Sequence, residues 1–178
     1  VRLGGFAFSG FRPILGAPET EFYRNKLEFT FSDSRWLTPE EILSGVDISE
    51  RNALGFHIPG RFDRILPIEK CFLQNDISNQ IRNALRDFAL ENQFSFFNLH
   101  SQKGLLRTLI LRNTSAGEWM VIVVFAEENL PVIQKTMRFL NEQFPQIQSL
   151  LYVVNQKRND TIHDLPVQVF AGRDYIEE

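Results

Sequence analysis

The stretch from Met120 to Phe125 constrains the fold most, because every residue in it is apolar. It is far shorter than the roughly 18 residues that a membrane-spanning helix needs. A strand without polar positions is typical of the middle of a sheet, where both faces are covered. We therefore expect a central strand here, buried on both faces.

Two segments have the periodicity of amphipathic helices. Apolar residues recur at intervals of four and three between residues 76 and 93, and again between 129 and 144, which places them on one face of each helix. Asn75 or Asp76 can cap the first helix, and Asn129 the second. Pro131 fits the first turn of the second helix, where a missing N–H is harmless. The expected core-facing residues are Ile77, Ile81, Leu85 and Phe88, then Ile133, Met137, Leu140 and Phe144.

The other segments predict strands joined by turns. Alternating apolar and polar residues, or short apolar runs bounded by turn residues, indicate strands, and a short helix is expected from Thr38 to Gly45. The order of elements predicts an α+β fold, with a mixed, mostly antiparallel sheet and helices packed on one face. The expected strands cover residues 24–31, 53–58, 105–112, 119–125, 148–154, 167–170 and 174–176.

Length and composition predict one globular domain. The chain has 178 residues, of which 43% are hydrophobic, and 17 phenylalanines can fill a core. Glycines and prolines punctuate residues 1–22 too closely for a helix or strand, so we expect an irregular connector there and a domain over residues 23–178. The single cysteine, Cys71, excludes an internal disulfide framework, and no targeting segment is visible, so a cytoplasmic protein is expected.

Several kinds of active site are missing from the residue pattern. No glycine-rich loop follows a strand and opens a helix, as a nucleotide or cofactor site requires. The three histidines lack paired metal-ligand spacing and are expected at the surface or in loops. Cys71 could act as a nucleophile, but the alternative, a buried and inert thiol, is favoured by residue chemistry alone.

The charged residues leave two interpretations open. The net charge of −3 argues against a surface that wraps nucleic acid all round. Residues 92–117 nevertheless contain no Asp or Glu, while Lys103, Arg107 and Arg112 fall inside them. These three can form a basic face or belong to a solvated hairpin. Arg24 and Lys26, at the start of the first strand, can likewise protect a sheet edge or contact phosphate.

Five segments resemble a known family, and they occur in that family's order: Tyr23–Ser32 (YRNKLEFTFS), Leu54–Asp63 (LGFHIPGRFD), Ile68–Gln74 (IEKCFLQ), Tyr152–Thr161 (YVVNQKRNDT) and Phe170–Glu178 (FAGRDYIEE). Together they are similar to motifs of bacterial RNA uracil-5-methyltransferases of the TrmA/RumA type. The matches run from Tyr23 to Glu178, which is nearly the whole chain.

The resemblance implies a longer parent protein, of which this chain is the central, substrate-side domain. Family members carry an N-terminal RNA-binding β-barrel and a C-terminal domain that uses S-adenosylmethionine and supplies the catalytic cysteine and base. Both are expected outside this chain, which begins with Val1 rather than Met. The chain is therefore expected to have no cofactor and no catalytic residues of its own, and to be inactive alone.

The resemblance also implies site residues and partners. Cys71 matches the fourth ligand of a four-iron four-sulfur cluster, whose other three cysteines would lie upstream of Val1. Arg24, Lys26 and Arg61 are the candidate RNA contacts, to ribosomal or transfer RNA. The other expected partners are the chain's own missing domains, and neither membrane nor DNA. The competing hypotheses are a freestanding, non-enzymatic RNA-binding module and a protein-interaction domain.

Overall fold

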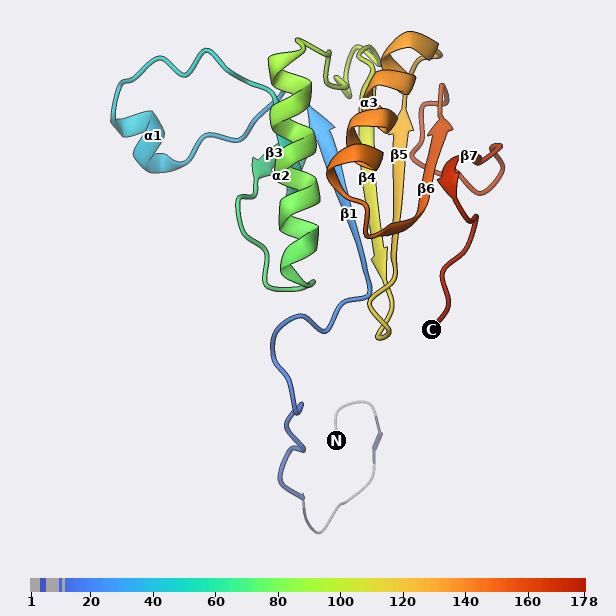
Figure 1. The fold of residues 1–178 in the computed structure, drawn as a ribbon. Helices are drawn as coiled ribbons and strands as arrows, with labels where there is room; N and C mark the ends of the chain where they lie inside the picture. Colours follow the sequence, from blue (N-terminus) through green and yellow to red (C-terminus); the bar gives the residue numbers. More distant parts are fainter. Residues whose placement is uncertain (1–3, 6–9, 11) are drawn as a thin grey trace.

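Seven strands form one continuous sheet in the computed structural model, which describes residues 4, 5, 10 and 12–178. Their order across the sheet is β3-β2-β1-β4-β5-β6-β7 (Figure 1). All neighbouring strands are antiparallel except β5 and β6, which are parallel. The strands are β1 (Lys26–Ser32), β2 (Ala53–Ile58), β3 (Arg61–Pro67), β4 (Leu106–Asn113), β5 (Trp119–Phe125), β6 (Ile147–Val154) and β7 (Gln168–Gly172).

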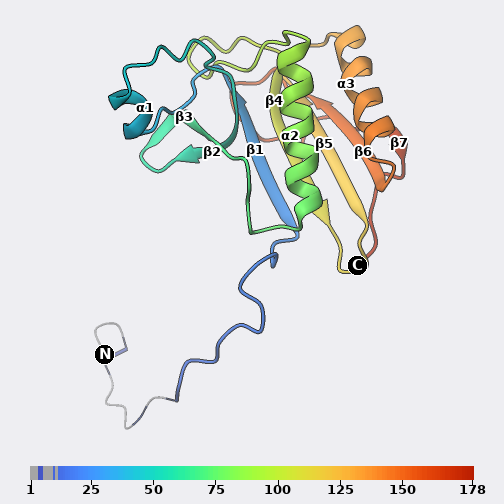
Figure 2. The same cartoon turned by 60° about the vertical axis from the view of Figure 1, so that its left-hand side comes forward.

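The two long helices cover one face of this sheet, side by side (Figures 1 and 2). They are α2 (Asp76–Glu91) and α3 (Leu130–Gln143), and they meet where the Phe88 and Phe139 rings stack with centroids 4.0 Å apart. The predicted α+β class, with a mostly antiparallel sheet and helices on one face, is confirmed.

The central strand β5 is buried on both faces, as its sequence predicts. Val121, Val123 and Phe125 belong to the main core under the helices. Ile122 and Val124 point to the opposite face and belong to a second, smaller cluster. Part of that cluster is covered by the loop that joins β6 to β7. We call the helix-free side of the sheet the open face.

Side-chain caps start all three helices where the sequence indicates. The Asn75 side chain accepts a hydrogen bond from the Ile77 amide at the start of α2, and the Asn129 side chain accepts one from the Val132 amide at the start of α3. The short α1 (Pro39–Leu43) has a capping box, formed by Thr38 and Glu41. These bonds satisfy amides that the first helical turn leaves unpaired.

Strand β3 is missing from the sequence prediction, and the predicted strand at residues 174–176 is wrong. Residues 61–67 lack an alternating pattern, so the sequence does not indicate a strand there. The strand forms because β3 pairs with β2 on one side, and Ile65 of β3 also forms a parallel bridge with Arg35. A Cβ atom at Gly55 of β2 would lie 1.9 Å from the Leu66 carbonyl oxygen, so only glycine fits this approach. Residues 174–176 form no ladder.

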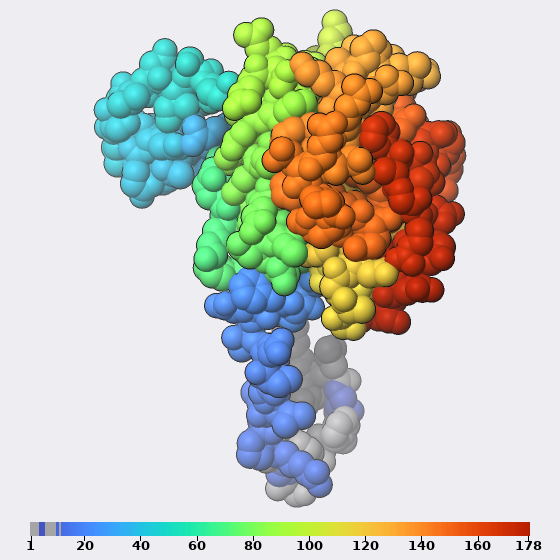
Figure 3. Space-filling model, viewed as in Figure 1, coloured from blue at the N-terminus to red at the C-terminus, as the bar shows by residue number. Residues whose placement is uncertain are grey.

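The segment before β1 has neither helix nor strand from residue 12 to residue 25, and it leads away from one end of the sheet (Figure 1). Its last part is tied down by backbone bonds from the Phe22 amide to the Phe72 oxygen and from the Arg24 amide to the Leu73 oxygen. Residues 1–3, 6–9 and 11 of the expected connector lie outside the described residues. Figure 3 shows that the α1 region also stands away from the main body.

Candidate functional site

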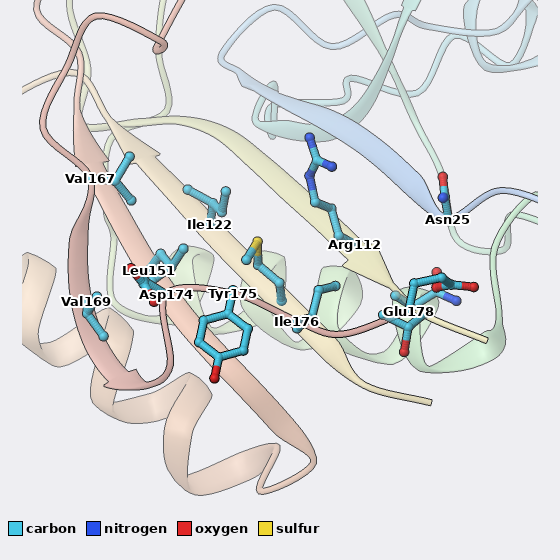
Figure 4. A pocket seen from close by; sticks show the side chains of 13 residues that line it. Asn25, Arg112, Ile122, Leu151, Val167, Val169, Asp174, Tyr175, Ile176 and Glu178 are labelled. Atoms are coloured by element: carbon cyan, nitrogen blue, oxygen red, sulfur yellow. The ribbon is translucent and has the colours of Figure 1, made fainter. Parts of the chain in front are cut away.

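Two adjoining clefts lie on the open face of the sheet. The first has a cavity volume of about 660 Å³ and the second about 520 Å³, and both are lined by Arg112, Ile122 and Val167. Residues 174–178 form one wall of the first cleft (Figure 4). The β6–β7 loop contributes to the second cleft through residues 160–163. We call this pair the open-face clefts.

Lys26 and Arg112 are the cations that β1 and β4 place on these clefts. They are directly opposite each other in the antiparallel register of the two strands. Lys26 forms an ion pair with Glu28, two residues along the same face of β1. The Arg112 guanidinium has no carboxylate within 4.0 Å among the described residues. Figure 4 shows its side chain extending across the sheet surface.

The three RNA-contact candidates do not share one cleft. Lys26 lies in the second open-face cleft, whereas Arg61 begins β3 and lines a separate cleft of about 490 Å³. Asp160 lines both of these clefts, so they are neighbours. Arg24 precedes β1 and is exposed, with its guanidinium 5.9 Å from the centre of the Tyr23 ring. The arrangement therefore places Lys26 and Arg61 at neighbouring clefts and Arg24 at the end of the sheet.

Arg107 is a structural residue that sequence reasoning did not separate from its basic neighbours. It lies at a register shift in β4 and is only 1% exposed. Its guanidinium donates to the carbonyl oxygens of Asn155, Lys157 and Asn159 and to the Asp160 carboxylate. The loop after β6 is therefore wrapped around this cation. Since Arg107 is buried and Arg112 lies on the open face, residues 92–117 do not form a single basic face.

The three histidines are exposed, as the sequence predicts. His57 of β2 has a defined role: one ring nitrogen, Nδ1, lies 2.7 Å from the Phe62 carbonyl, and Nε2 lies 3.1 Å from the Thr30 hydroxyl. Because a carbonyl only accepts, Nδ1 donates to Phe62, and in the neutral imidazole Nε2 then accepts from the Thr30 hydroxyl. The histidine thereby ties β1 to the β2–β3 hairpin.

Cys71 is buried in the segment that leads into α2, which agrees with the interpretation of a structural thiol. Its backbone amide donates to Asn79 Oδ1 at 2.8 Å, and its carbonyl accepts from Asn79 Nδ2 at 3.1 Å. No group of three or more metal-ligating side chains converges anywhere in the described part of the chain. One thiolate does not hold an iron–sulfur cluster, so the residues of this chain alone do not fit one.

Arg82, on the buried side of α2, is a second buried cation, and the sequence did not single it out. It is 1% exposed, donates to the Glu69 carbonyl at 2.8 Å, and lies 4.9 Å from the centre of the Phe29 ring. Burial lowers the pKa of Arg82 to about 10. The guanidinium therefore stays charged at neutral pH, and its hydrogen bond to Glu69 holds the segment that leads into α2.

The last residues of the chain are clamped to the turn between β4 and β5. Arg173 forms a 2.6 Å ion pair with Glu118, whose carboxylate also accepts from the Glu177 amide at 2.9 Å. The Glu178 carboxylate accepts from the Ser115 amide. These contacts, rather than a sheet ladder, place residues 174–178 along the first open-face cleft.

Proteins of known sequence relate the chain to one enzyme class. No family model matches it. It is 52% identical over 99% of its length to an RNA methyltransferase of Bacteroides thetaiotaomicron and 49% identical over 100% to one of Porphyromonas gingivalis. The resemblance to RNA methyltransferases is confirmed. The chain spans only 40% and 39% of these two curated relatives.

A solved structure supports the fold. The tRNA (uracil-54, C5)-methyltransferase of Pyrococcus abyssi, in complex with S-adenosyl-L-homocysteine, matches 89% of this chain with a TM-score of 0.63. The two sequences are 21% identical, and the match covers 33% of that enzyme. In the part of this chain that the structure describes, no helix has the length and apolarity to cross a membrane.

Proposed function

We propose that this chain is the substrate-side domain of a longer, S-adenosylmethionine-dependent RNA uracil-5-methyltransferase. The observation that carries the proposal is its 52% identity, over 99% of its length, to a protein named an RNA methyltransferase, of which it covers 40%. The fold likeness to a tRNA uracil methyltransferase supports the uracil-specific reading. The five ordered motifs point the same way.

In this proposal the chain binds and presents RNA, and methyl transfer takes place in another part of the longer protein. S-adenosylmethionine supplies the methyl group and is held there. Residues 1–22 connect the preceding RNA-binding domain to the domain of residues 23–178, and the catalytic domain follows Glu178. The RNA is ribosomal or transfer RNA, and the protein acts in the cytoplasm.

The residues of this chain have positioning roles in the proposal. Lys26 and Arg61 lie at neighbouring clefts, from which they can hold the RNA backbone, and Arg24 can extend that contact at the end of β1. Cys71 serves as one cluster ligand in the longer protein, with three cysteines supplied from outside this chain. Its position, held by two hydrogen bonds to Asn79, would fix such a ligand.

The proposal is tested by methyl transfer from labelled S-adenosylmethionine to bulk RNA. The 178-residue chain alone is expected to transfer none. A chimera, in which this chain replaces the matching segment of the Bacteroides thetaiotaomicron relative, is expected to retain that relative's methylation, because their 52% identity preserves the core and the domain contacts.

The unmodified relative and a chimera with an unrelated domain of similar size are the controls. Methyl incorporation by the purified 178-residue chain would contradict the proposal. So would a folded chimera that leaves RNA unmethylated while the unmodified relative methylates it.

A further inference from the structure

Two cations face each other across neighbouring strands on the open face. Lys26 and Arg112 are directly opposite in the β1–β4 register, a position at which like charges destabilise a sheet. Directly opposite residues of such a pair have Cβ atoms roughly 5 Å apart. An anion that bridges both side chains would turn this repulsion into attraction.

The acidic residues of the open-face clefts already have other partners or lie elsewhere. Glu28 pairs with Lys26, but this exposed pair leaves Arg112 uncompensated. Asp160 is held by Arg107, and Glu178 accepts from the Ser115 amide. Asp174 lies at the other side of the first cleft from Arg112 (Figure 4). Arg112 is therefore the cation that the described residues leave available to a ligand.

The surroundings of Arg112 favour a phosphodiester. The side chain lines both open-face clefts where they adjoin, and Asn25 in the first cleft and Thr108 in the second add polar groups to their lining. A guanidinium binds phosphate oxygens in a forked, bidentate manner, and a lysine adds a point charge. Ile110 and Ile122 lie at the base of the second cleft and offer an apolar surface to a base or sugar.

We propose that Lys26 and Arg112 form one phosphate-binding site, which holds a single strand of the substrate RNA along the open face. This inference rests on the proposed function. It adds Arg112 to the residues that contact RNA, and it adds the path that the RNA strand follows. The clefts continue from β1 to the wall of residues 174–178, so a bound strand runs toward the end of the sheet where both chain ends leave. A folded-out strand fits such clefts better than a duplex does.

The test is fluorescence anisotropy of labelled oligouridylate with the 178-residue chain across a series of salt concentrations. Arg112→Ala is expected to weaken binding about tenfold at low salt, the effect of losing one charge-assisted contact. The Lys26→Ala and Arg112→Ala double variant should lower the log–log salt slope by about 0.7, the value for one phosphate contact on a single strand, because both side chains hold the same phosphate. Arg112→Lys should retain the slope while losing part of the affinity.

Arg138→Ala is the matched control, because Arg138 is an exposed arginine of α3 on the opposite, helix-covered side. Circular dichroism melting shows that each variant is folded. An Arg112→Ala variant that binds like Arg138→Ala would overturn the phosphate site and leave the proposed function standing. A wild-type chain that binds no oligouridylate at low salt would contradict the proposed function, in which this chain binds RNA. Competition by polyglutamate as strong as by RNA would make the face a site for an acidic polypeptide and overturn the assignment.

Discussion

Two arginines five positions apart show how the fold separates residues of the same chemistry. Arg107 and Arg112 are both on β4, yet one is buried and the other is exposed. Arg107 bonds to three carbonyl oxygens of the loop after β6, so it organises the wall of the second cleft. Arg112 has no such partner and projects onto the open face.

We predict that Arg107→Met lowers the free energy of unfolding by roughly 3 kcal/mol, because it removes the donor to three carbonyl groups of the loop, of which that of Asn155 is buried. The exposed Asp160 partner adds little to this loss. The measurement is the urea midpoint. Lys103→Ala, an exposed cation four residues earlier, is the control and should stay within about 0.5 kcal/mol of the wild type. Equal midpoints for the two variants would show that Arg107 is not the anchor of the loop.

At the scale of elements, the C-terminal segment is held by side chains where a strand is expected. Gly172, with φ of +75°, ends β7, and its missing Cβ leaves room for the Gln148 carbonyl. The chain then turns along the first cleft and is held by the ion pair of Glu118 and Arg173. The Glu118 carboxylate accepts hydrogen bonds from the Arg173 side chain and from the Glu177 amide. These two bonds, the first more than the second, hold the pKa of Glu118 below its ordinary value.

This clamp should depend on pH. A lowered folded-state pKa means that the contribution of Glu118 is present above its ordinary pKa of 4.5 and is lost as the pH falls through the lowered value. At neutral pH, Glu118→Gln should therefore reduce the hydrogen-exchange protection of the Glu177 amide, and the difference from the wild type should shrink below pH 4.5. Glu142→Gln, on the exposed side of α3, should change nothing. A difference that stays constant down to acid pH would rule out the ionised clamp.

At the scale of the whole molecule, one sheet and two helices form the main core, and the α1 region lies outside it. No residue of α1 is buried, and Ile42 and Leu43 are 64% and 85% exposed. The segment before β1 and the last residues of the chain lie at the same end of the sheet (Figure 2). Both segments therefore meet the sheet at the end where residues 174–178 line the first open-face cleft.

This organisation predicts two levels of stability. Amides of α1 should exchange with solvent through local opening, whereas those of β4 and β5 should exchange only through global unfolding. Leu43→Ala should change the free energy of unfolding by less than about 0.5 kcal/mol. Leu109→Ala, in the buried core, should lower it by about 2–5 kcal/mol. Comparable protection in α1 and β5, measured by native-state hydrogen exchange, would contradict the separation.

Elements that depend on local patterns can be predicted from the residue order alone. The apolar stretch of β5, the helix periodicities and the caps Asn75 and Asn129 all act between near neighbours, so their signals are present in the residue order. The ordered motifs likewise indicated the RNA methyltransferases. Several motif residues, such as Gly55 and His57, are now explained by packing rather than by contact with a substrate.

Which residues of similar type meet depends on the pairing of distant segments in the fold. Strand β3 exists because β2 and the Arg35 segment pair with it, and residues 174–176 lack a partner strand in this chain. The burial of Arg107, the exposure of Arg112 and the pairing of Arg112 opposite Lys26 depend on a strand register that joins residues 86 positions apart. The physical reason is that side-chain direction alternates along a strand and register is set between strands, so long-range pairing, rather than local composition, determines which charges are left for a ligand.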